Sequence, residues 1–379
     1  MHIVVVSELE IGSRRAHAIN VIKTAGGFAR LGHRVTLLCR SGEGEVSAYL
    51  HELGEEGLEV ELWDGPAGTA GGSRAMGDWA CARALALGAD AVYARHFAAA
   101  VACSRAGLAT TLETHAYVGD ANPMLVEAVR ATRGGRGRSL RSIVTISDRL
   151  ADWYAQLGAD ASRIGVIPDG VDVERFARPG TLEVADPLRE GREDGRPIAV
   201  YSGHLYDYKG VPTVLDAAAL ASDWDFALVG GMPEDIERTR ARVTERALAN
   251  VRVIGWVPHR EVPGYLWHAD ALLLPPSARE ASKDWTSPVK LGEYLASGRP
   301  IVASAIPALR DWLGDDEAIW FTPDDAASLV EGLSLVRTMP GSVRESLRMQ
   351  GQSRAREFAY ARRAERILRS LGESRTLAA

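Results

Sequence analysis

The stretch Lys283-Asp-Trp-Thr-Ser-Pro-Val-Lys-Leu-Gly-Glu-Tyr-Leu-Ala-Ser-Gly-Arg-Pro-Ile-Val-Ala-Ser304 predicts a loop, a helix and a strand in succession. Thr286 and Ser287 carry hydroxyl groups suited to capping a helix, and Pro288 has the fixed φ favoured at a first helical position. Residues 300–303 form a short apolar run after the helix, which is typical of a buried strand. The stretch therefore indicates a parallel α/β domain.

The start of this predicted helix is a candidate anion site. A helix N-terminus holds unpaired N–H groups and partial positive charge, and Lys290 adds a full charge in the first turn. A phosphate or diphosphate would suit the position formed by Ser287, Pro288, Val289 and Lys290. The alternative, an ordinary capped helix in an α/β domain, stays open on local chemistry alone.

Length and composition limit the function classes. A chain of 379 residues is long enough for two domains with separate cores. Its net charge of −6 gives no general case for nucleic acid as a partner. The three cysteines have no paired spacing, and the first residues lead directly into a strand without a signal-peptide pattern. We therefore expect a cytoplasmic protein without a metal framework or a membrane span.

Short apolar runs alternate with helical patterns in both halves of the chain, which predicts α/β architecture with parallel sheets. The predicted strands are residues 3–6, 35–39, 58–63, 91–94, 110–114, 143–147, 164–167, 198–201, 226–229, 251–254 and 271–274. Residues 7–13 should break the first strand, residues 66–73 should form a loop before a helix at 79–87, and residues 342–371 should form one long helical segment. Residues 178–196 are rich in glycine and charge and mark the expected domain boundary.

Several residues follow predicted strands in the first half. The loop after the first strand contains only Gly12, so it is no G-x-G-x-x-G dinucleotide fingerprint. Arg14 and Arg15 open the next helix, where they either face an anionic ligand or are solvated on the helix flank. His96 and His115 each lie just past the carboxyl end of a strand, where open α/β sheets bind ligands. A lone histidine there is more often structural, and His115 is the better functional candidate.

Residues 130–141 carry arginines interleaved with glycine, namely Arg130, Arg133, Arg136, Arg138 and Arg141. Such a run usually forms a mobile, solvated loop. The alternative is contact with anionic lipid headgroups or with a phosphorylated acceptor, which would place the protein at the inner face of the membrane.

Four stretches, in order, resemble the motifs of family 4 of the B-fold glycosyltransferases, which retain anomeric configuration. Residues 166–176 resemble the interdomain I-P-N-G-V-D…F segment, and residues 201–210 resemble the G-R-L…K-G loop. Residues 253–257 resemble the base-binding turn, and residues 287–300 resemble the donor-site helix of a subgroup with S-P-x-K-L-x-E-Y. The resemblance extends over essentially the whole chain and is strongest from about residue 143 to 312.

The resemblance implies two Rossmann-like domains facing across a cleft, with a C-terminal helix that crosses back. Residues 1–180 would bind the acceptor, residues 181–355 the nucleotide-sugar donor, and residues 356–379 would pack on the N-terminal domain. The implied catalytic residues are His115 near the transferred sugar, Lys209 at the donor diphosphate and Glu293 at the ribose hydroxyls. The remaining implied donor-binding residues are Gly12, Gly203, His204, Trp256, Val257, Ser287, Pro288, Val289 and Lys290.

Two positions depart from the family pattern. His204 stands where the loop arginine is usual, and its charge would depend on pH. Trp285 stands where the first glutamate of the Glu-x7-Glu pattern is usual, and Glu280 lies upstream as a candidate replacement contact to the donor sugar.

The expected function is therefore transfer of a hexose from a UDP- or GDP-sugar to a hydroxyl acceptor such as a glycan, a glycolipid or a small-molecule natural product. Fixed positive groups would stabilise the leaving diphosphate, so we expect neither a metal nor a cofactor. Two alternatives stay open, a catalytically silent nucleotide-sugar-binding protein or partner subunit, and a nucleotide-sugar epimerase of the same fold. The sequence does not indicate the oligomeric state or the acceptor.

Overall fold

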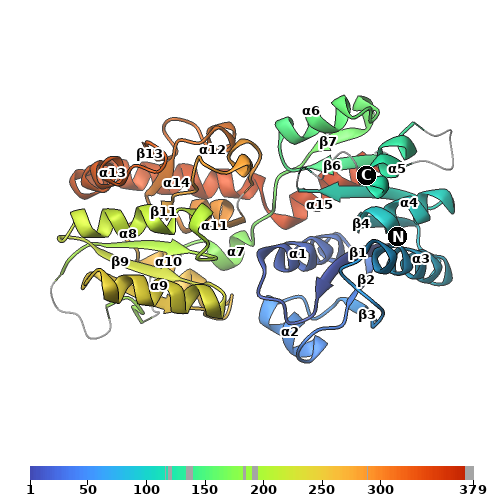
Figure 1. Cartoon of the computed structure of the whole chain (residues 1–379), viewed down its shortest axis with the longest axis horizontal. Helices are drawn as coiled ribbons and strands as arrows, with labels where there is room; N and C mark the ends of the chain where they lie inside the picture. The colour runs from blue at the N-terminus through green and yellow to red at the C-terminus, as the bar shows by residue number, and fades with distance from the viewer. Residues whose placement is uncertain are drawn as a thin grey trace. The chain divides into compact units, whose positions relative to one another are not determined.

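The computed structural model describes residues 1–115, 117, 122–133, 140–181, 185–189, 195–287 and 289–371. The chain forms two compact units (Figure 1). Unit 1 contains Met1–Gly170 together with the chain from Ala359 onward, and unit 2 contains Val171–Phe358. Each unit is a parallel sheet with helices packed against it, the architecture that alternating strands and helices predict.

Unit 1 is built on a seven-stranded sheet of order β3-β2-β1-β4-β5-β6-β7, in which every recorded pairing is parallel. Its strands are β1 (His2–Glu10), β2 (Arg34–Arg40), β3 (Glu59–Trp63), β4 (Ala91–Arg95), β5 (Ala109–Thr114), β6 (Ser142–Thr145) and β7 (Ile164–Val166). Its helices are α1 (Ala16–Arg30), α2 (Val46–Leu53), α3 (Ala70–Ala86), α4 (Phe97–Arg105), α5 (Pro123–Ala131), α6 (Asp148–Gln156), the 3₁₀ turn η1 (Ala161–Arg163) and α15 (Tyr360–Ser370).

Unit 2 is built on a six-stranded sheet of order β10-β9-β8-β11-β12-β13, again with parallel pairings. Its strands are β8 (Ile198–Ser202), β9 (Asp225–Val229), β10 (Val251–Gly255), β11 (Ala271–Leu274), β12 (Ile301–Ser304) and β13 (Ile319–Phe321). Its helices are α7 (Val173–Phe176), η2 (Asp207–Lys209), α8 (Val211–Leu220), α9 (Pro233–Glu245), α10 (Val262–His268), η3 (Ala281–Asp284), α11 (Val289–Ser297), α12 (Pro307–Trp312), α13 (Ala326–Thr338) and α14 (Gly341–Glu357).

The central strands are buried on both faces, which explains their continuous apolar runs. Ile3, Val4, Val5 and Val6 of β1 are each at most 1% exposed. In each sheet the strand order reverses beside the first strand, between β1 and β4 in unit 1 and between β8 and β11 in unit 2. Loops leave such a reversal in opposite directions and open a crevice at the carboxyl ends of the strands. Ligand sites are therefore expected in the loops after these strands.

The C-terminal helix α15 belongs to the core of unit 1. Ala364, Ile367 and Leu368 pack in the same apolar cluster as residues of β1 and α1. α15 approaches α1 so closely that a Cβ on Gly27 would lie 2.6 Å from the carbonyl oxygen of Tyr360. Burying an aliphatic side chain of this size contributes roughly 1.5–3 kcal/mol, so α15 is a major stabilising element of unit 1.

The quoted stretch around residue 290 folds as predicted. α11 begins at Val289 and ends at Ser297, and Leu291 and Leu295 on one face of it are both buried. Gly298 after the helix has φ +67°, and β12 follows at Ile301. Pro288 lies outside the described residues.

Three local predictions were wrong. β1 does not break at residue 7 but continues to Glu10 through an irregular register after Val6. α3 begins at Ala70 inside the predicted loop, because the Thr69 hydroxyl accepts a hydrogen bond from Gly72 N and caps the helix despite its glycines. The predicted C-terminal helical segment is two helices, α14 and α15, separated by residues 358–359.

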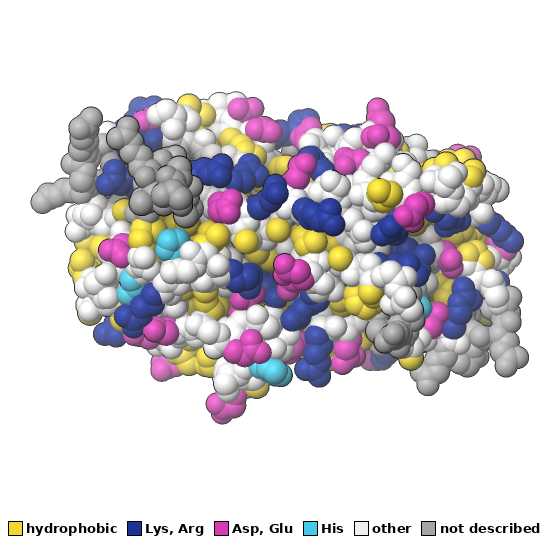
Figure 2. All heavy atoms as spheres, turned by 180° about the vertical axis from the view of Figure 1, so that it is seen from behind, with side chains coloured by type: hydrophobic (Ala, Val, Ile, Leu, Met, Phe, Trp, Pro, Cys, Tyr) yellow, Lys and Arg dark blue, Asp and Glu magenta, His cyan; other side chains and the backbone are white. Residues whose placement is uncertain are grey.

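None of the described helices combines the length and the apolar character that crossing a membrane requires. Figure 2 shows Lys and Arg side chains interspersed with Asp and Glu over the visible face. In the arginine-rich segment, Arg130 lies in the last turn of α5. Arg136 and Arg138 lie outside the described residues.

Candidate functional site

Two lysines of unit 2 meet at the carboxyl end of β8, beside the reversal of the strand order. Gly203 follows β8 with φ +124°, and a Cβ on it would lie only 2.8 Å from Lys290 Nζ. Lys209 ends η2 in the same loop, and its charge lowers the pKa of Lys290. The predicted loop and the predicted helix therefore bring their lysines together.

Neither lysine has an ion-pair partner among the described residues, although both are partly buried. Burial lowers the pKa of Lys209. The pKa of Lys290 lies well below its ordinary value because of burial and then of Lys209, with Glu293 acting in the opposite direction. Two neighbouring lysines that form no ion pair with the described residues leave an excess of positive charge, which a bound anion would neutralise.

Two tyrosines fix Lys290 and its helix. The Lys290 ammonium lies 3.8 Å from the ring centroid of Tyr201, a cation–π contact. Tyr201 Oη donates to His204 O at 2.5 Å, which closes the loop after β8. Tyr294 Oη accepts from Ser202 N at 2.9 Å and donates to Leu273 O at 3.2 Å, so it joins α11 to β8 and β11.

Gly203 leaves room beside Lys290, but its backbone N–H is not available to a ligand. Gly203 N donates to Val229 O at 2.8 Å, so its N–H is already used. Val289 and Lys290, by contrast, lie in the first turn of α11, where backbone N–H groups have no partner within the helix. Backbone donors for an anion are therefore expected from α11.

Glu293 lies one turn after Lys290 in α11 and is 9% exposed. Its Oε1 is 3.2 Å from Nε2 of His259, a residue that sequence reasoning did not single out. The ring of His259 packs edge-on against Phe176, with centroids 5.3 Å apart. The histidine pairing therefore restricts the orientation of the carboxylate.

The remaining predicted residues of unit 2 lie around this loop and after β10. His204 stacks on Tyr206, with ring centroids 5.0 Å apart, and Tyr206 stacks on Tyr208 at 5.4 Å. Glu280, at the start of η3, raises the pKa of Tyr208 after burial and Tyr206, which places it near this stack. Trp256, directly after β10, is 37% exposed, and Val257 packs against the core of unit 2.

Gly12 and His96 lie in unit 1, after β1 and β4. Gly12 has φ +81°, and a Cβ there would lie 2.0 Å from Glu43 O, so the turn requires glycine. His96 Nδ1 accepts from Ala99 N at 3.0 Å and caps α4, while its Nε2 faces Glu8 Oε1 at 2.9 Å. Both ring nitrogens of His96 therefore have partners within unit 1, which is typical of a structural histidine.

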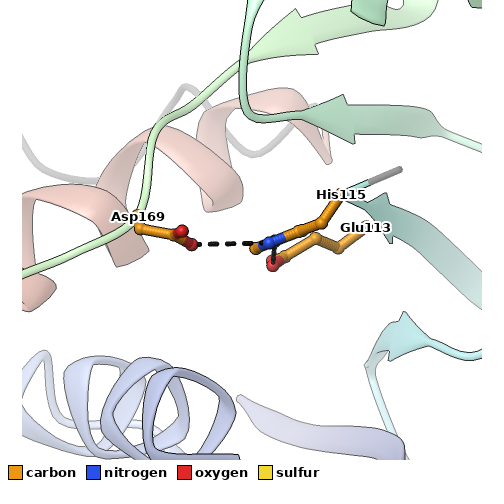
Figure 3. Close-up of side chains that lie close together, drawn as sticks. All are labelled: Glu113, His115 and Asp169. Atoms are coloured by element: carbon orange, nitrogen blue, oxygen red, sulfur yellow. Dashed lines mark hydrogen bonds and ion pairs between the residues drawn. The ribbon is translucent and has the colours of Figure 1, made fainter. Parts of the chain in front are cut away.

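His115 lies between two carboxylates at the carboxyl end of β5 (Figure 3). Its Nε2 hydrogen-bonds Glu113 Oε1, and its Nδ1 is 3.7 Å from Asp169 Oδ1. Asn20 Nδ2 of α1 donates to the same Asp169 oxygen at 2.7 Å. α1, β5 and the loop after β7 thus all contribute to one polar cluster.

Arg363 of α15 neutralises the buried end of this cluster. Its Nη2 lies 2.8 Å from Glu113 Oε2, and its other nitrogens donate to Pro168 O, Thr24 Oγ1 and Tyr93 Oη. Burial alone would raise the pKa of Glu113, but Arg363 and then His115 hold it lowered to about 2. Glu113 is therefore an ionised carboxylate at neutral pH.

Glu113, His115 and Asp169 each offer a metal-ligand atom, and these atoms lie within 4.8 Å of one another. The arrangement suits a cation poorly. Each carboxylate faces a different nitrogen of the imidazole, and the Arg363 guanidinium lies 2.8 Å from Glu113. A metal ion would have to replace the His115–Glu113 bond beside a fixed positive charge.

Sequence reasoning singled out His115 but none of the residues that surround it, namely Asn20, Glu113, Asp169 and Arg363. The sequence held one feature that could have drawn attention to Asp169. Asp169 stands in the segment Val166-Ile-Pro-Asp-Gly-Val-Asp172, where the resembling motif has asparagine.

Both halves of the chain match glycosyltransferase family models. The model described as Glycosyl transferases group 1 matches residues 196–337, and the model described as Glycosyltransferase Family 4 matches residues 19–175. The fold agrees with solved structures. HepE from Anabaena, in complex with UDP and glucose, has a TM-score of 0.73 at 17% identity, covering 98% of this chain and 99% of that one. A glycosyltransferase from Rickettsia africae has a TM-score of 0.76 at 14% identity, covering 100% and 99%.

Two curated relatives are similar in sequence. A 2-deoxystreptamine N-acetyl-D-glucosaminyltransferase of Streptomyces fradiae is 32% identical over 189 residues, which is 47% of this chain and 42% of that protein. A 2-deoxystreptamine glucosyltransferase of Streptomyces kanamyceticus is 28% identical over 229 residues, 58% of this chain and 57% of that protein. The matched segments thus span about half the length of these relatives. Taken together, the comparisons support a glycosyltransferase with the B fold.

Proposed function

We propose that the chain transfers a sugar from a nucleoside-diphosphate sugar to a hydroxyl group of a polyol acceptor, with retention of anomeric configuration. The donor diphosphate binds in unit 2 beside Lys209 and Lys290. Backbone N–H groups near Ser287 and at Val289, at the start of α11, bind the same phosphate groups.

The unpaired lysines are the observation that carries this proposal. Lys209 and Lys290 are partly buried neighbours without a counter-ion among the described residues, and burial lowers the pKa of both. An isolated buried charge is unfavourable unless a partner compensates it. A diphosphate supplies that partner, and it gains charge as the glycosidic bond breaks, so the lysines stabilise the transition state more than the bound substrate.

The other residues take roles consistent with their positions. Glu293, oriented by His259, accepts hydrogen bonds from the ribose hydroxyls, and the backbone at Trp256 and Val257 contacts the nucleobase. Lys290 supplies the positive charge that His204 lacks when it is neutral. We propose that these cations make a metal ion unnecessary for the leaving group.

A small amino-bearing cyclitol is the acceptor class that we propose first. The two relatives described above act on 2-deoxystreptamine by their names, and one transfers glucose and the other N-acetylglucosamine. The neighbour from Anabaena holds UDP and glucose by its description. UDP-sugars are therefore the first donors to test. The buried free thiols of Cys39, Cys81 and Cys103 fit a reducing compartment, and we propose that transfer takes place in the cytoplasm.

The first experiment measures binding of UDP to the full chain by titration calorimetry, followed by transfer from UDP-glucose and UDP-N-acetylglucosamine to 2-deoxystreptamine. We expect Lys209→Met and Lys290→Met each to lower turnover by about 10²–10³-fold, because each removes one preorganised charge at the diphosphate. Both variants should unfold at the wild-type temperature or above it, since neither lysine has an ion pair with a described residue to lose.

Arg337→Met is the matched control, because Arg337 is an exposed cation of unit 2 on α13 whose recorded ion pair is with Asp223. It should leave UDP binding unchanged. Binding of UDP without transfer or hydrolysis of any donor would favour the silent nucleotide-sugar-binding protein. Wild-type turnover in both lysine variants would remove the diphosphate assignment.

A further inference from the structure

Asn20 holds a buried acceptor atom for which the described part of the chain offers no hydrogen-bond partner. The residue is 1% exposed in the middle of α1, and its Oδ1 has no hydrogen-bond partner among the described residues. Buried polar atoms are nearly always hydrogen-bonded in folded proteins. An orphaned acceptor at the carboxyl end of a parallel sheet therefore points to a ligand that donates a hydrogen bond.

The orientation of the Asn20 amide follows from its neighbour. Nδ2 donates to Asp169 Oδ1 at 2.7 Å. Turning the amide over would bring its own oxygen to that distance from a carboxylate oxygen, and two acceptors repel each other there. Oδ1 is therefore the atom left over, and the donor that satisfies it must come from outside this pair.

The surroundings of Asn20 favour an uncharged hydroxyl over an ion. Asp169 Oδ1 accepts from Asn20 Nδ2 and lies 3.7 Å from His115 Nδ1. The groups near the Asn20 amide are therefore a carboxylate and an imidazole. The cluster already balances its charges, since Arg363 pairs with Glu113 and Asp169 acts electrostatically on Arg95. A hydroxyl both donates and accepts, so it satisfies Asn20 without disturbing this balance.

We propose that Asn20, Asp169 and His115 form a hydroxyl-binding subsite of unit 1, in which Asn20 Oδ1 accepts a hydrogen bond from a hydroxyl group of a sugar or cyclitol substrate. The subsite rests on the proposed function, because that function supplies a polyol. The same chemistry is offered by the transferred sugar of the donor and by the acceptor. Asn20 is then a specificity-determining residue, since an analogue that lacks the hydroxyl leaves a buried acceptor unpaired.

The test separates binding from stability by comparing two buried asparagines. Asn20→Leu removes the orphaned oxygen and also the Nδ2 donor to Asp169, so it costs one hydrogen bond to a carboxylate that is only 6% exposed. Asn250→Leu is the matched control. Asn250 is 7% exposed in unit 2, and its Nδ2 donates to the carbonyl oxygens of Ala218, Ala221 and Trp224, so its loss leaves bonded groups unpaired.

We expect Asn20→Leu to lower the unfolding temperature only by the loss of its one bond to Asp169 and to keep its affinity for UDP, while KM rises about 10- to 100-fold for the substrate that carries the hydroxyl. Asn250→Leu should lower the unfolding temperature more, because three carbonyl oxygens lose their donor, and should leave KM unchanged. Steady-state measurements with UDP-glucose and 2-deoxystreptamine assign the source. A rise in donor KM, together with slower hydrolysis of donor alone, assigns the hydroxyl to the transferred sugar, and a rise in acceptor KM alone assigns it to the acceptor.

Unchanged KM values for both substrates in Asn20→Leu would overturn the subsite while leaving the proposed function intact. A fall in unfolding temperature like that of Asn250→Leu, with both KM values unchanged, would make Asn20 a structural residue. Asn20→Ala repeats the measurement if the leucine variant does not fold. Failure of the wild-type chain to bind UDP, UDP-glucose or 2-deoxystreptamine would overturn the proposed function, and the subsite with it.

Discussion

In unit 1 the deeply buried cations Lys23 and Arg363 have carboxylate partners, Glu55 and Glu113, whereas in unit 2 Lys209 and Lys290 have no such partner among the described residues. The first arrangement is complete without a ligand. The second leaves two like charges side by side, and their mutual effect is visible in the lowered pKa of Lys290. Charge that a fold neutralises internally supports structure, and charge that it leaves unneutralised indicates where a ligand supplies the remainder.

The largest expected effect is a loss of stability when the buried ion pair of unit 1 is broken. Arg363→Leu leaves Glu113 buried without its counter-ion and removes three further hydrogen bonds of the guanidinium. We expect the free energy of unfolding of unit 1 to fall by about 3–5 kcal/mol, the usual cost of removing one partner of a buried ion pair. Denaturant unfolding measures it.

Lys290→Met serves as the control for that experiment, because it removes a partly buried cation that has no ion pair with any residue the structure describes. Its free energy of unfolding should equal or exceed that of the wild type. Similar losses in both variants would mean that the two units do not differ in how they treat buried charge.

The next effect is a loss of stability at low pH. Burial raises the pKa of Glu113, but Arg363 and His115 lower it more, from 4.5 to about 2. The stabilisation from this carboxylate is therefore complete above pH 4.5 and is lost as the pH falls towards 2. The shift corresponds to about 3 kcal/mol. Unfolding measured from pH 7 downward should show a steeper loss in the wild type than in Glu113→Gln, and equal slopes would contradict the assignment.

The smallest expected effect is a change of UDP affinity with pH, which depends on Lys290 in unit 2. The pKa of Lys290 is depressed by burial and by Lys209, and an anion binds the protonated form. UDP affinity should therefore fall as the pH rises through the Lys290 pKa, by several-fold for the loss of one charge contact. Calorimetric titrations of UDP at a series of pH values below 10.5, the ordinary pKa of a lysine, check this. Lys290→Arg, whose guanidinium stays protonated, should flatten the dependence.

Much of the fold follows from local patterns in the chain. Apolar runs at residues 3–6 and 198–201 correspond to the first strand of each sheet, because strands buried on both faces need continuous apolar residues. α11 was predicted from its flanking residues and its two leucines. At α3, where the prediction was wrong, a single contact decided, because the capping bond of Thr69 starts the helix ahead of three glycines.

The candidate sites were predictable to different degrees. Lys209 and Lys290 stand in motif-like stretches, and the rule that parallel strands end at one edge brings those stretches together. The surroundings of His115 gave no comparable signal, since Asn20 and Asp169 are 149 residues apart and Glu113 and Arg363 are 250 residues apart. No periodicity or spacing links such residues, because their proximity results from the path of the whole chain.

The position of α15 in the chain has a consequence for biosynthesis. Unit 1 receives its last core helix and the counter-ion of Glu113 only after all of unit 2 has been synthesised, since α15 begins at Tyr360. On the ribosome, residues 1–170 emerge first, yet Glu113 lacks its guanidinium partner until Arg363 leaves the exit tunnel. Unit 1 therefore cannot assemble its complete core until the whole of unit 2 has been translated.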